Sequence, residues 1–160
     1  MTPLTWLIGL VFPACAAVGA QGLPHPRPVD MTRIERPASP NSALAAAVDF
    51  QPRPDVLTPP YRLPAPRLYA ALRTVAAAQP RTFIAAEYPA ELQIHWVARS
   101  AVLNFPDLIT AQVVATGQDS SALVLYSRSV YGYSDFGVNR QRVDTWLAAL
   151  RTLLNRSDER

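Results

Sequence analysis

The side chains best suited to chemistry lie in one short stretch, from Ser127 to Arg140, and in a few residues that could fold against it. Guanidinium groups and the free N–H groups at the start of a helix can together hold an anion. The same side chains can instead satisfy one another and lock a turn. The residues considered for either role are Arg99, Asp107, Arg128, Tyr133, Asp135, Asn139, Arg140 and Arg142.

The first half of this stretch is the end of a predicted strand, in which successive side chains point to opposite faces of the sheet. Arg128 then shares a face with Val124 and Tyr126, so its head group needs a partner or water while its stem is buried. Asp107 follows a proline at the start of an earlier strand, where a carboxylate commonly caps a turn. If the strands form a hairpin, Asp107 approaches Arg99 or reaches toward Arg128.

The second half opens a helix. Ser134 or Asp135 is placed to cap its first turn, and Asp135 also complements the helix dipole. At about 100° per residue, Asn139 falls in the middle of the apolar stripe, with Arg140 and Arg142 on either side. Gly137 costs helix stability and predicts close approach by other backbone. This pattern favours a structural lock, and leaves only the arginines for recognition.

Catalytic and metal-binding patterns are missing from the sequence. His95 is the only histidine in the predicted domain, and no spacing of His, Asp or Glu indicates a metal site. No nucleophile elbow, phosphate loop or dinucleotide fingerprint is found. We therefore expect no catalytic residue, no metal and no cofactor. A weaker alternative is an enzyme that uses Asp107, Asp135 and the arginines.

The N-terminal segment reads as an export signal. Residues 4–20 carry no charge, and small residues precede a plausible cleavage point before Gln21. We therefore predict a signal peptide over residues 1–20 and a protein that is periplasmic or attached to the membrane facing the periplasm. No Lys or Arg precedes the apolar run, so an uncleaved membrane anchor through residues 4–20 remains the alternative. Cys15, the only cysteine, leaves with the signal or is lipidated.

Proline content divides the rest of the chain. Thirteen of the 16 prolines lie at or before Pro66, so residues 21–60 are predicted to be an extended leader. A single domain is expected over residues 61–154, followed by a polar tail over 155–160. Its elements are a helix from about 66 to 76, strands at 82–87, 91–98, 108–115 and 122–130, and a helix over 136–154. The predicted fold is α+β: a two-layer sandwich of a four-stranded, largely antiparallel sheet flanked by two helices on one face.

The junction also resembles a known family. Tyr126-Ser127-Arg128-Ser129, followed by the run from Gly132 to Arg140, is similar to the signature of the bacterial domain-of-unknown-function family 1499. The resemblance covers roughly residues 37–154 and includes Phe105-Pro106-Asp107. Many members carry Cys where this chain has Ser42, so a thiol-based role would not transfer. The resemblance implies an exported or membrane-anchored protein and supplies no catalytic residues.

These observations favour a non-enzymatic module of the cell envelope that binds an envelope protein or lipid component. The alternative is a small-ligand or lipid-binding domain, with a groove between sheet and helices and an anion held by Arg128 and Arg140. All 15 basic residues are arginines scattered along the chain, which is not the clustered stripe of a nucleic-acid-binding protein.

Overall fold

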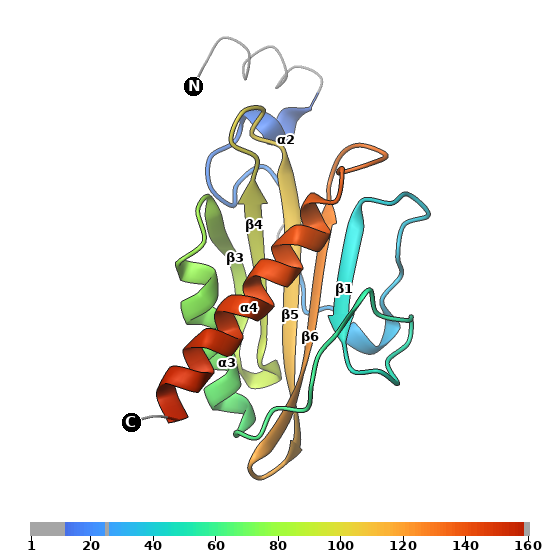
Figure 1. The fold of residues 1–160 in the computed structure, drawn as a ribbon. Coiled ribbons are helices and arrows are strands. Elements are labelled where there is room, and N and C mark those ends of the chain that lie inside the picture. Colours follow the sequence, from blue (N-terminus) through green and yellow to red (C-terminus); the bar gives the residue numbers. More distant parts are fainter. Residues whose placement is uncertain (1–11, 25, 159–160) are drawn as a thin grey trace.

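The protein is built on one six-stranded sheet, with strand order β2-β1-β6-β5-β4-β3 (Figure 1). The computed structural model describes residues 12–24 and 26–158. All neighbouring strands are antiparallel except β1 and β2, which run parallel. The strands are β1 (Ser42–Ala46), β2 (Val56–Leu57), β3 (Thr82–Tyr88), β4 (Gln93–Arg99), β5 (Pro106–Gly117) and β6 (Ser120–Ser129).

Two long helices cover one face of this sheet. Helix α3 (Ala65–Ala77) starts with prolines in its first turn, where a missing N–H costs nothing, and α4 is Val138–Asp158. Their apolar stripes pack on the sheet in the main core, where the Trp96 and Trp146 rings meet edge to face at 5.2 Å between centroids. The short elements are α2 (Pro13–Ala16), η1 (Met31–Arg33) and η2 (Pro89–Glu91).

The α+β class and the helix–four strands–helix order are confirmed, but the strand count is wrong. The missed strands β1 and β2 lie within the stretch predicted to be an extended leader. β1 has the sequence SALAA, and its small residues carry little of the β-branched pattern that marks a strand. It is stabilised by antiparallel pairing with β6, a partner far away in the sequence. Helix α4 also extends to Asp158, into the predicted polar tail.

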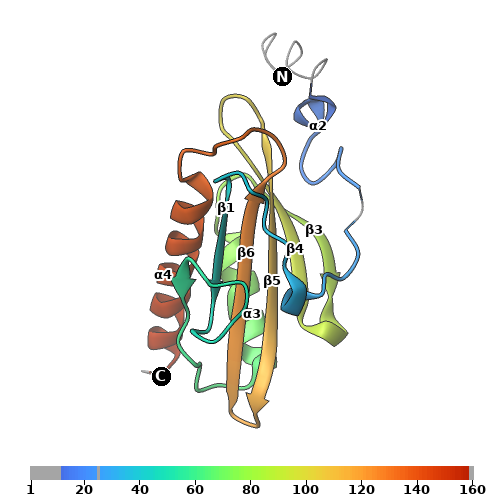
Figure 2. The ribbon, with the colours of Figure 1, turned by 90° about the vertical axis from the view of Figure 1, so that its right-hand side faces the viewer.

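The opposite face of the sheet is covered as well, by residues 12–24 and 26–36, which we call the strap (Figure 2). Met31 and Ile34 of the strap are buried against Leu44, Val124 and Tyr126 of the sheet. The molecule therefore has a third layer where two were predicted. A proline-rich segment can form such a layer because it lies across a sheet without joining its hydrogen-bond ladder.

The register of β6 decides which side chains face which layer. Leu123 and Leu125 pack in the helix-side core, whereas Val124 and Tyr126 pack under the strap. The predicted alternation of this strand is confirmed. Ser127 continues the helix-facing row, and Arg128 lines the space under the strap. In the part of the chain that the structure describes, no helix is both long and apolar enough to cross a bilayer; residues 4–11 of the predicted export segment lie outside that part.

Candidate functional site

On the helix side of the junction, an ion pair joins sheet and helix. The Asp107 carboxylate on β5 lies 2.6 Å from the Arg142 guanidinium on α4, and both side chains are largely buried. Arg142 also donates to Ser127 Oγ at 2.9 Å and to Asn139 Oδ1 at 2.6 Å. The expectation that Asp107 would pair with Arg99 or Arg128 is wrong. Arg128 is on the other face of the sheet, because β6 alternates, and Arg99 turns to that face as well.

Asn139 is the centre of this arrangement. Its side chain is fully buried, as its position in the apolar stripe predicted. The amide nitrogen lies 3.0 Å from the Asn41 carbonyl, 3.0 Å from Ser129 Oγ and 2.7 Å from Asp135 Oδ2. Its Oδ1 accepts from Ser127 Oγ at 2.6 Å. One amide thus links the residue before β1, the end of β6 and the start of α4. We call this set of residues the helix-side network: Asn41, Asp107, Ser127, Ser129, Asp135, Asn139 and Arg142.

Asp135 has the capping role predicted for it. Its carboxylate accepts from the backbone N–H of Gly137 at 3.0 Å and of Asn139 at 2.7 Å. The close approach predicted at Gly137 is wrong, because a Cβ built there would meet nothing within 4 Å. Gly137 is needed instead for its φ of +82°, a left-handed conformation just before the helix.

The other two candidates on this side are exposed. Arg140 pairs with Asp144 one helical turn further on, at 3.0 Å and in solvent. Tyr133 projects from the connection between β6 and α4. The polar groups of the helix-side network are turned toward one another, so this corner has a structural role: it holds the start of α4 against the sheet. Asp107 is paired with Arg142, and Asp135 is hydrogen-bonded to the start of α4.

Arg99 contacts the strap and no carboxylate among the described residues. Its guanidinium donates to the carbonyl oxygens of Ala14 at 2.7 Å, Gly19 at 2.6 Å and Gln21 at 2.7 Å. Asn104 adds bonds to the carbonyls of Cys15 at 2.7 Å and Ala17 at 3.0 Å. Arg99 therefore holds the first half of the strap in place through hydrogen bonds to the strap backbone. Burial lowers the Arg99 pKa and raises that of the nearby Cys15 thiol.

A cavity of about 480 Å³ lies between the strap and the sheet, and we call it the strap cavity. Its walls are mainly apolar, and both the strap and the sheet contribute polar or charged side chains. A second space of about 420 Å³ shares Leu23, Pro24, Pro26 and Leu108 with it. The strap cavity is lined by Leu23, Pro24, Pro26, Arg27, Val29, Met31, Arg33, Ile34 and Glu35 from the strap and by His95, Leu108, Ile109, Thr110, Tyr126 and Arg128 from the sheet.

Two groups in the strap cavity have unused hydrogen-bonding capacity. Tyr126 is 8% exposed, and its buried hydroxyl has no hydrogen-bond partner. Arg128, beside it on the same face of β6, has no ion-pair or hydrogen-bond partner among the described residues. A buried hydroxyl without a partner costs about 1–3 kcal/mol, so it is uncommon in a folded protein. These two groups are therefore unsatisfied among the described residues, unlike the polar groups of the helix-side network.

Gln93 fastens the strap to the sheet, and His95, on the same sheet wall as Tyr126, positions the Gln93 side chain. The His95 Nε2 lies 2.8 Å from Gln93 Oε1, and Gln93 in turn bonds both backbone groups of Val29, at 2.7 and 2.8 Å. The hydroxyl of Thr110 lies 3.2 Å from His95 Nδ1. The neutral Nε2–H tautomer fits these contacts, with Thr110 donating to Nδ1. Burial lowers the pKa of His95 to about 4, so the ring is neutral at ordinary pH.

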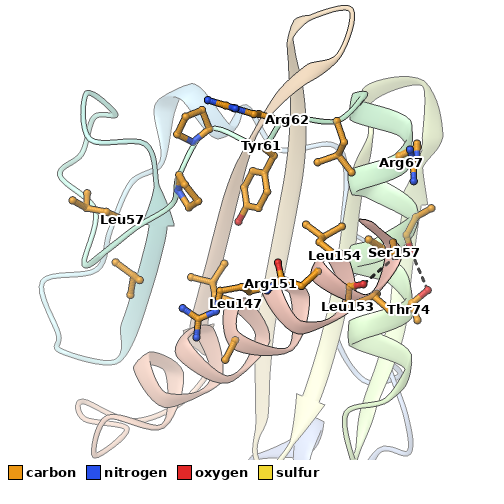
Figure 3. Close-up of a pocket in the computed structure, with 18 of the residues that line it drawn as sticks. Leu57, Tyr61, Arg62, Arg67, Thr74, Leu147, Arg151, Leu153, Leu154 and Ser157 are labelled. Carbon is orange, nitrogen blue, oxygen red and sulfur yellow. Dashed lines mark hydrogen bonds between the residues drawn. The ribbon is translucent and has the colours of Figure 1, made fainter. Parts of the chain in front are cut away.

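A larger open groove, about 740 Å³, lies between α3, α4 and residues 56–63 (Figure 3). Tyr61, Leu147 and Leu154 contribute to its lining, and burial raises the pKa of Tyr61 to about 12. The arginines around this groove are Arg62, Arg67 and Arg151. The expected groove between sheet and helices ending at Arg128 and Arg140 is therefore wrong: Arg128 lies across the sheet, and Arg140 does not line this groove.

Comparison with known proteins identifies a family for most of this architecture. A family model described as "Protein of unknown function (DUF1499)" matches residues 34–150, which is more than half of the chain. The matched region begins within the strap and includes the helix-side network and the sheet side of the strap cavity. No curated protein matches the chain, and no solved structure matches it. Within the described residues, no cluster of three or more His, Cys, Asp or Glu side chains could hold a metal ion.

Proposed function

Because the chain belongs to the DUF1499 family of proteins of unknown function, we propose a function from its own geometry: it is a non-enzymatic binding module of the cell envelope that holds a small amphipathic anion in the strap cavity. The observation that carries this proposal is a pair of neighbouring groups on β6, the Tyr126 hydroxyl and the Arg128 guanidinium, neither of which has a partner among the described residues. Ligand pockets combine an apolar lining with a few polar groups that fix orientation.

The charge around the strap cavity favours an anion. Arg27, Arg33 and Arg128 line it, whereas Glu35 is the only acidic residue among the described residues of the lining. Arg33 lies 3.8 Å from Asp30 and is largely in solvent, so Arg128 is the cation best placed for a buried contact. A carboxylate or phosphate would accept charge-assisted hydrogen bonds from Arg128 and a further bond from the Tyr126 hydroxyl.

The apolar part of the ligand would lie along the strap. Leu23, Pro24 and Pro26 face both the strap cavity and the adjoining space, and Leu108 forms the floor between them. This continuous apolar wall suits an alkyl chain that extends away from Arg128. A ligand with an acidic head and a short hydrocarbon tail, such as a medium-chain carboxylate, matches both features.

Two further observations support a binding role in the envelope. Asp107 and Asp135, the carboxylates of the enzyme alternative, are occupied by Arg142 and by the N–H groups that open α4. The uncharged N-terminal segment is typical of an exported or membrane-anchored chain. Export, attachment and binding therefore form one proposal, with no chemical step assigned to the protein.

Titration of the full chain with decanoate tests the ligand. We expect saturable binding by calorimetry, and Arg128→Gln should weaken it about tenfold or more, since a charge-assisted hydrogen bond is worth about 1.5–3 kcal/mol. Arg140→Gln is the matched control, because Arg140 is exposed and already paired with Asp144.

A third variant distinguishes decanoate binding in the strap cavity from binding in the open groove between α3 and α4. Arg151→Gln changes the open groove and leaves the strap cavity intact. If Arg151→Gln weakens decanoate binding and Arg128→Gln does not, the ligand occupies the groove and the proposed site is wrong. Binding that no substitution affects would also count against the strap cavity.

A further inference from the structure

The connection between β6 and α4 exposes two aromatic side chains. Tyr133 is 76% exposed and Phe136 is 95% exposed, and Val138 at the start of α4 is 46% exposed. Large apolar groups that gather on one short connection commonly mark an interaction surface. We call this connection, residues 131–138, the aromatic loop. The helix-side network lies directly beneath it and does not use either ring.

Phe136 holds an unfavourable backbone conformation as well as an exposed ring. Its φ is +54°, in the left-handed region that a bulky aromatic residue rarely adopts. Asn would adopt this conformation at less cost, because its short polar side chain tolerates it. The Phe136 side chain is 95% exposed, so its packing within the described chain does not compensate for the strain. Strain of this kind is typical of sites where a side chain is held ready for a partner.

The aromatic loop is held in this shape by hydrogen bonds on both sides. Ser134 Oγ accepts from the Phe136 N–H at 3.2 Å, and the Asp135 carbonyl accepts from the Val138 N–H at 3.1 Å. Asn41, just before β1, donates to the Gly132 carbonyl at 2.7 Å. The helix-side network therefore fixes the position of the two rings, which lowers the entropy lost when they bind.

The aromatic loop also meets the N-terminal segment. The rings of Phe12 and Tyr131 have centroids 4.9 Å apart, and Phe12 packs against Phe105 at 5.6 Å. In the sequence, Phe12 directly follows the uncharged run Leu4–Val11. Figures 1 and 2 place α2 and the aromatic loop toward the same end of the sheet, away from the C-terminal end of α4. In the alternative in which residues 4–20 are retained as a membrane anchor, the membrane that receives them would face the aromatic loop.

We propose that the aromatic loop is a membrane-contact site whose Tyr133 and Phe136 rings enter the interfacial region of a lipid bilayer. Aromatic side chains with one apolar and one polar end partition to this region, which suits Tyr133, and Phe136 adds apolar area. A protein pocket could also receive such rings, but the contact with Phe12 makes the bilayer the favoured partner. This inference shares only the envelope location with the proposed function and needs no ligand in the strap cavity.

An environment-sensitive probe on the aromatic loop tests the contact. In the full chain carrying Cys15→Ala, Val138→Cys is labelled with a nitrobenzoxadiazole dye, which leaves both rings in place. With vesicles of phosphatidylcholine containing one-quarter phosphatidylglycerol, we expect a blue shift and quenching by spin-labelled lipid. A matched probe at Val48→Cys, 78% exposed beyond the far end of β1, should stay aqueous.

Substitution of the rings then separates loop contact from attachment by the N-terminal run. Phe136→Asn and Tyr133→Ser should each lose most of the blue shift at position 138, even where the protein still sediments with the vesicles. Phe136→Asn should also raise the thermal midpoint, because it relieves the left-handed strain without removing a contact. Val48→Ser should change neither quantity.

Three results would overturn the proposal. The first is no vesicle binding by the full chain; the second is an aqueous probe at position 138 in vesicle-bound protein. The third is photocrosslinking of the aromatic loop to an envelope protein while the probe remains aqueous in vesicles, which would identify a protein pocket as the partner. Decanoate titration is independent of all three, so a failure here and a failure of the strap-cavity ligand are distinguishable.

Discussion

Neighbouring residues of β6 point to opposite faces of the sheet, one toward the helices and one toward the strap. The two faces differ in whether the polar side chains have hydrogen-bond partners. Ser127 points to the helices and bonds Asn139 and Arg142 within the helix-side network. Tyr126 and Arg128, on either side of it in the sequence, point to the strap and leave a hydroxyl and a guanidinium without partners in the described chain. A side chain's role in this strand is set by its face, and polar character alone does not identify a site.

The difference has an energetic meaning. Burying a polar group costs little when it is hydrogen-bonded and much when it is not. The helix-side network therefore stabilises the fold, whereas the strap cavity keeps an unfavourable group that a ligand can satisfy. The comparison predicts that substitutions on the helix side change stability and leave ligand binding unchanged. Those on the strap side should change ligand binding more than stability.

The largest effect should come from breaking the Asp107–Arg142 pair. Asp107→Asn leaves the Arg142 charge largely buried without its counter-ion, and we expect a loss of about 3 kcal/mol in the free energy of unfolding. Urea denaturation measures the loss, and decanoate affinity should be unchanged. Asp144→Asn, which breaks the exposed pair with Arg140, should cost less than about 0.5 kcal/mol. Equal losses of unfolding free energy in the two variants would show that the helix-side network does not stabilise the fold more than an exposed ion pair does.

Acid should act on the strap side through His95. The pKa of His95 is about 4 in the folded protein, and its ordinary value is 6.5. Between pH 4 and pH 6.5, therefore, His95 binds a proton in the unfolded chain but not in the folded protein. Stability is full above pH 6.5 and falls as the pH drops toward 4, by up to about 3 kcal/mol.

The variant His95→Gln supplies a donor and an acceptor without a titrating ring. Its free energy of unfolding, measured by urea denaturation across this pH range, should depend less on pH than that of the unmodified chain. Because His95 orients Gln93, which bonds Val29, acid should also speed proteolysis of the strap. An unchanged pH profile in the variant would mean that His95 does not exclude protons.

The smallest effect on stability should come from Tyr126→Phe. The sign of its change in the free energy of unfolding tests whether the two faces of β6 differ. Removing an unpartnered buried hydroxyl should raise the free energy of unfolding by about 1 kcal/mol while weakening decanoate binding about tenfold. Denaturation and calorimetry on the same samples provide both values. A loss of stability would reveal that the hydroxyl is satisfied in the free protein, and the difference between the two faces would disappear at this position.

Much of the fold was predictable from local patterns. The four strands and two helices from about residue 65 onward follow periodicities of two and 3.6 in runs rich in apolar residues, and each lies close to its predicted range. Strands β1 and β2 were not predictable in this way. β1 consists of small residues, and β2 has two residues held by the parallel pairing of Ala45 with Val56 and of Ala46 with Leu57.

The candidate site was predicted only in part, for a related reason. The periodicity placed Asn139 in the apolar stripe and Arg128 beside Tyr126, and both positions are confirmed. The partner of Asp107 was wrong because pairing across a sheet and a helix depends on their relative placement. Tyr126 was overlooked as a site residue, although alternation had put it next to Arg128. The missing fact was the strap, which turns that face from a solvent-exposed surface into a cavity wall.

The sequence by itself determined what depends on spacing along the chain: the α+β class, the alternation of β6, the capping role of Asp135 and the family signature. The tertiary structure alone decided which polar groups are satisfied. A hydrogen-bond partner can come from anywhere in the chain, as Asn41 does for Asn139 across 98 residues. Local pattern placed the side chains of the Ser127–Arg140 stretch, but only the packed layers decide that Ser127 helps to hold the fold together and that Arg128 lines the strap cavity without a partner among the described residues.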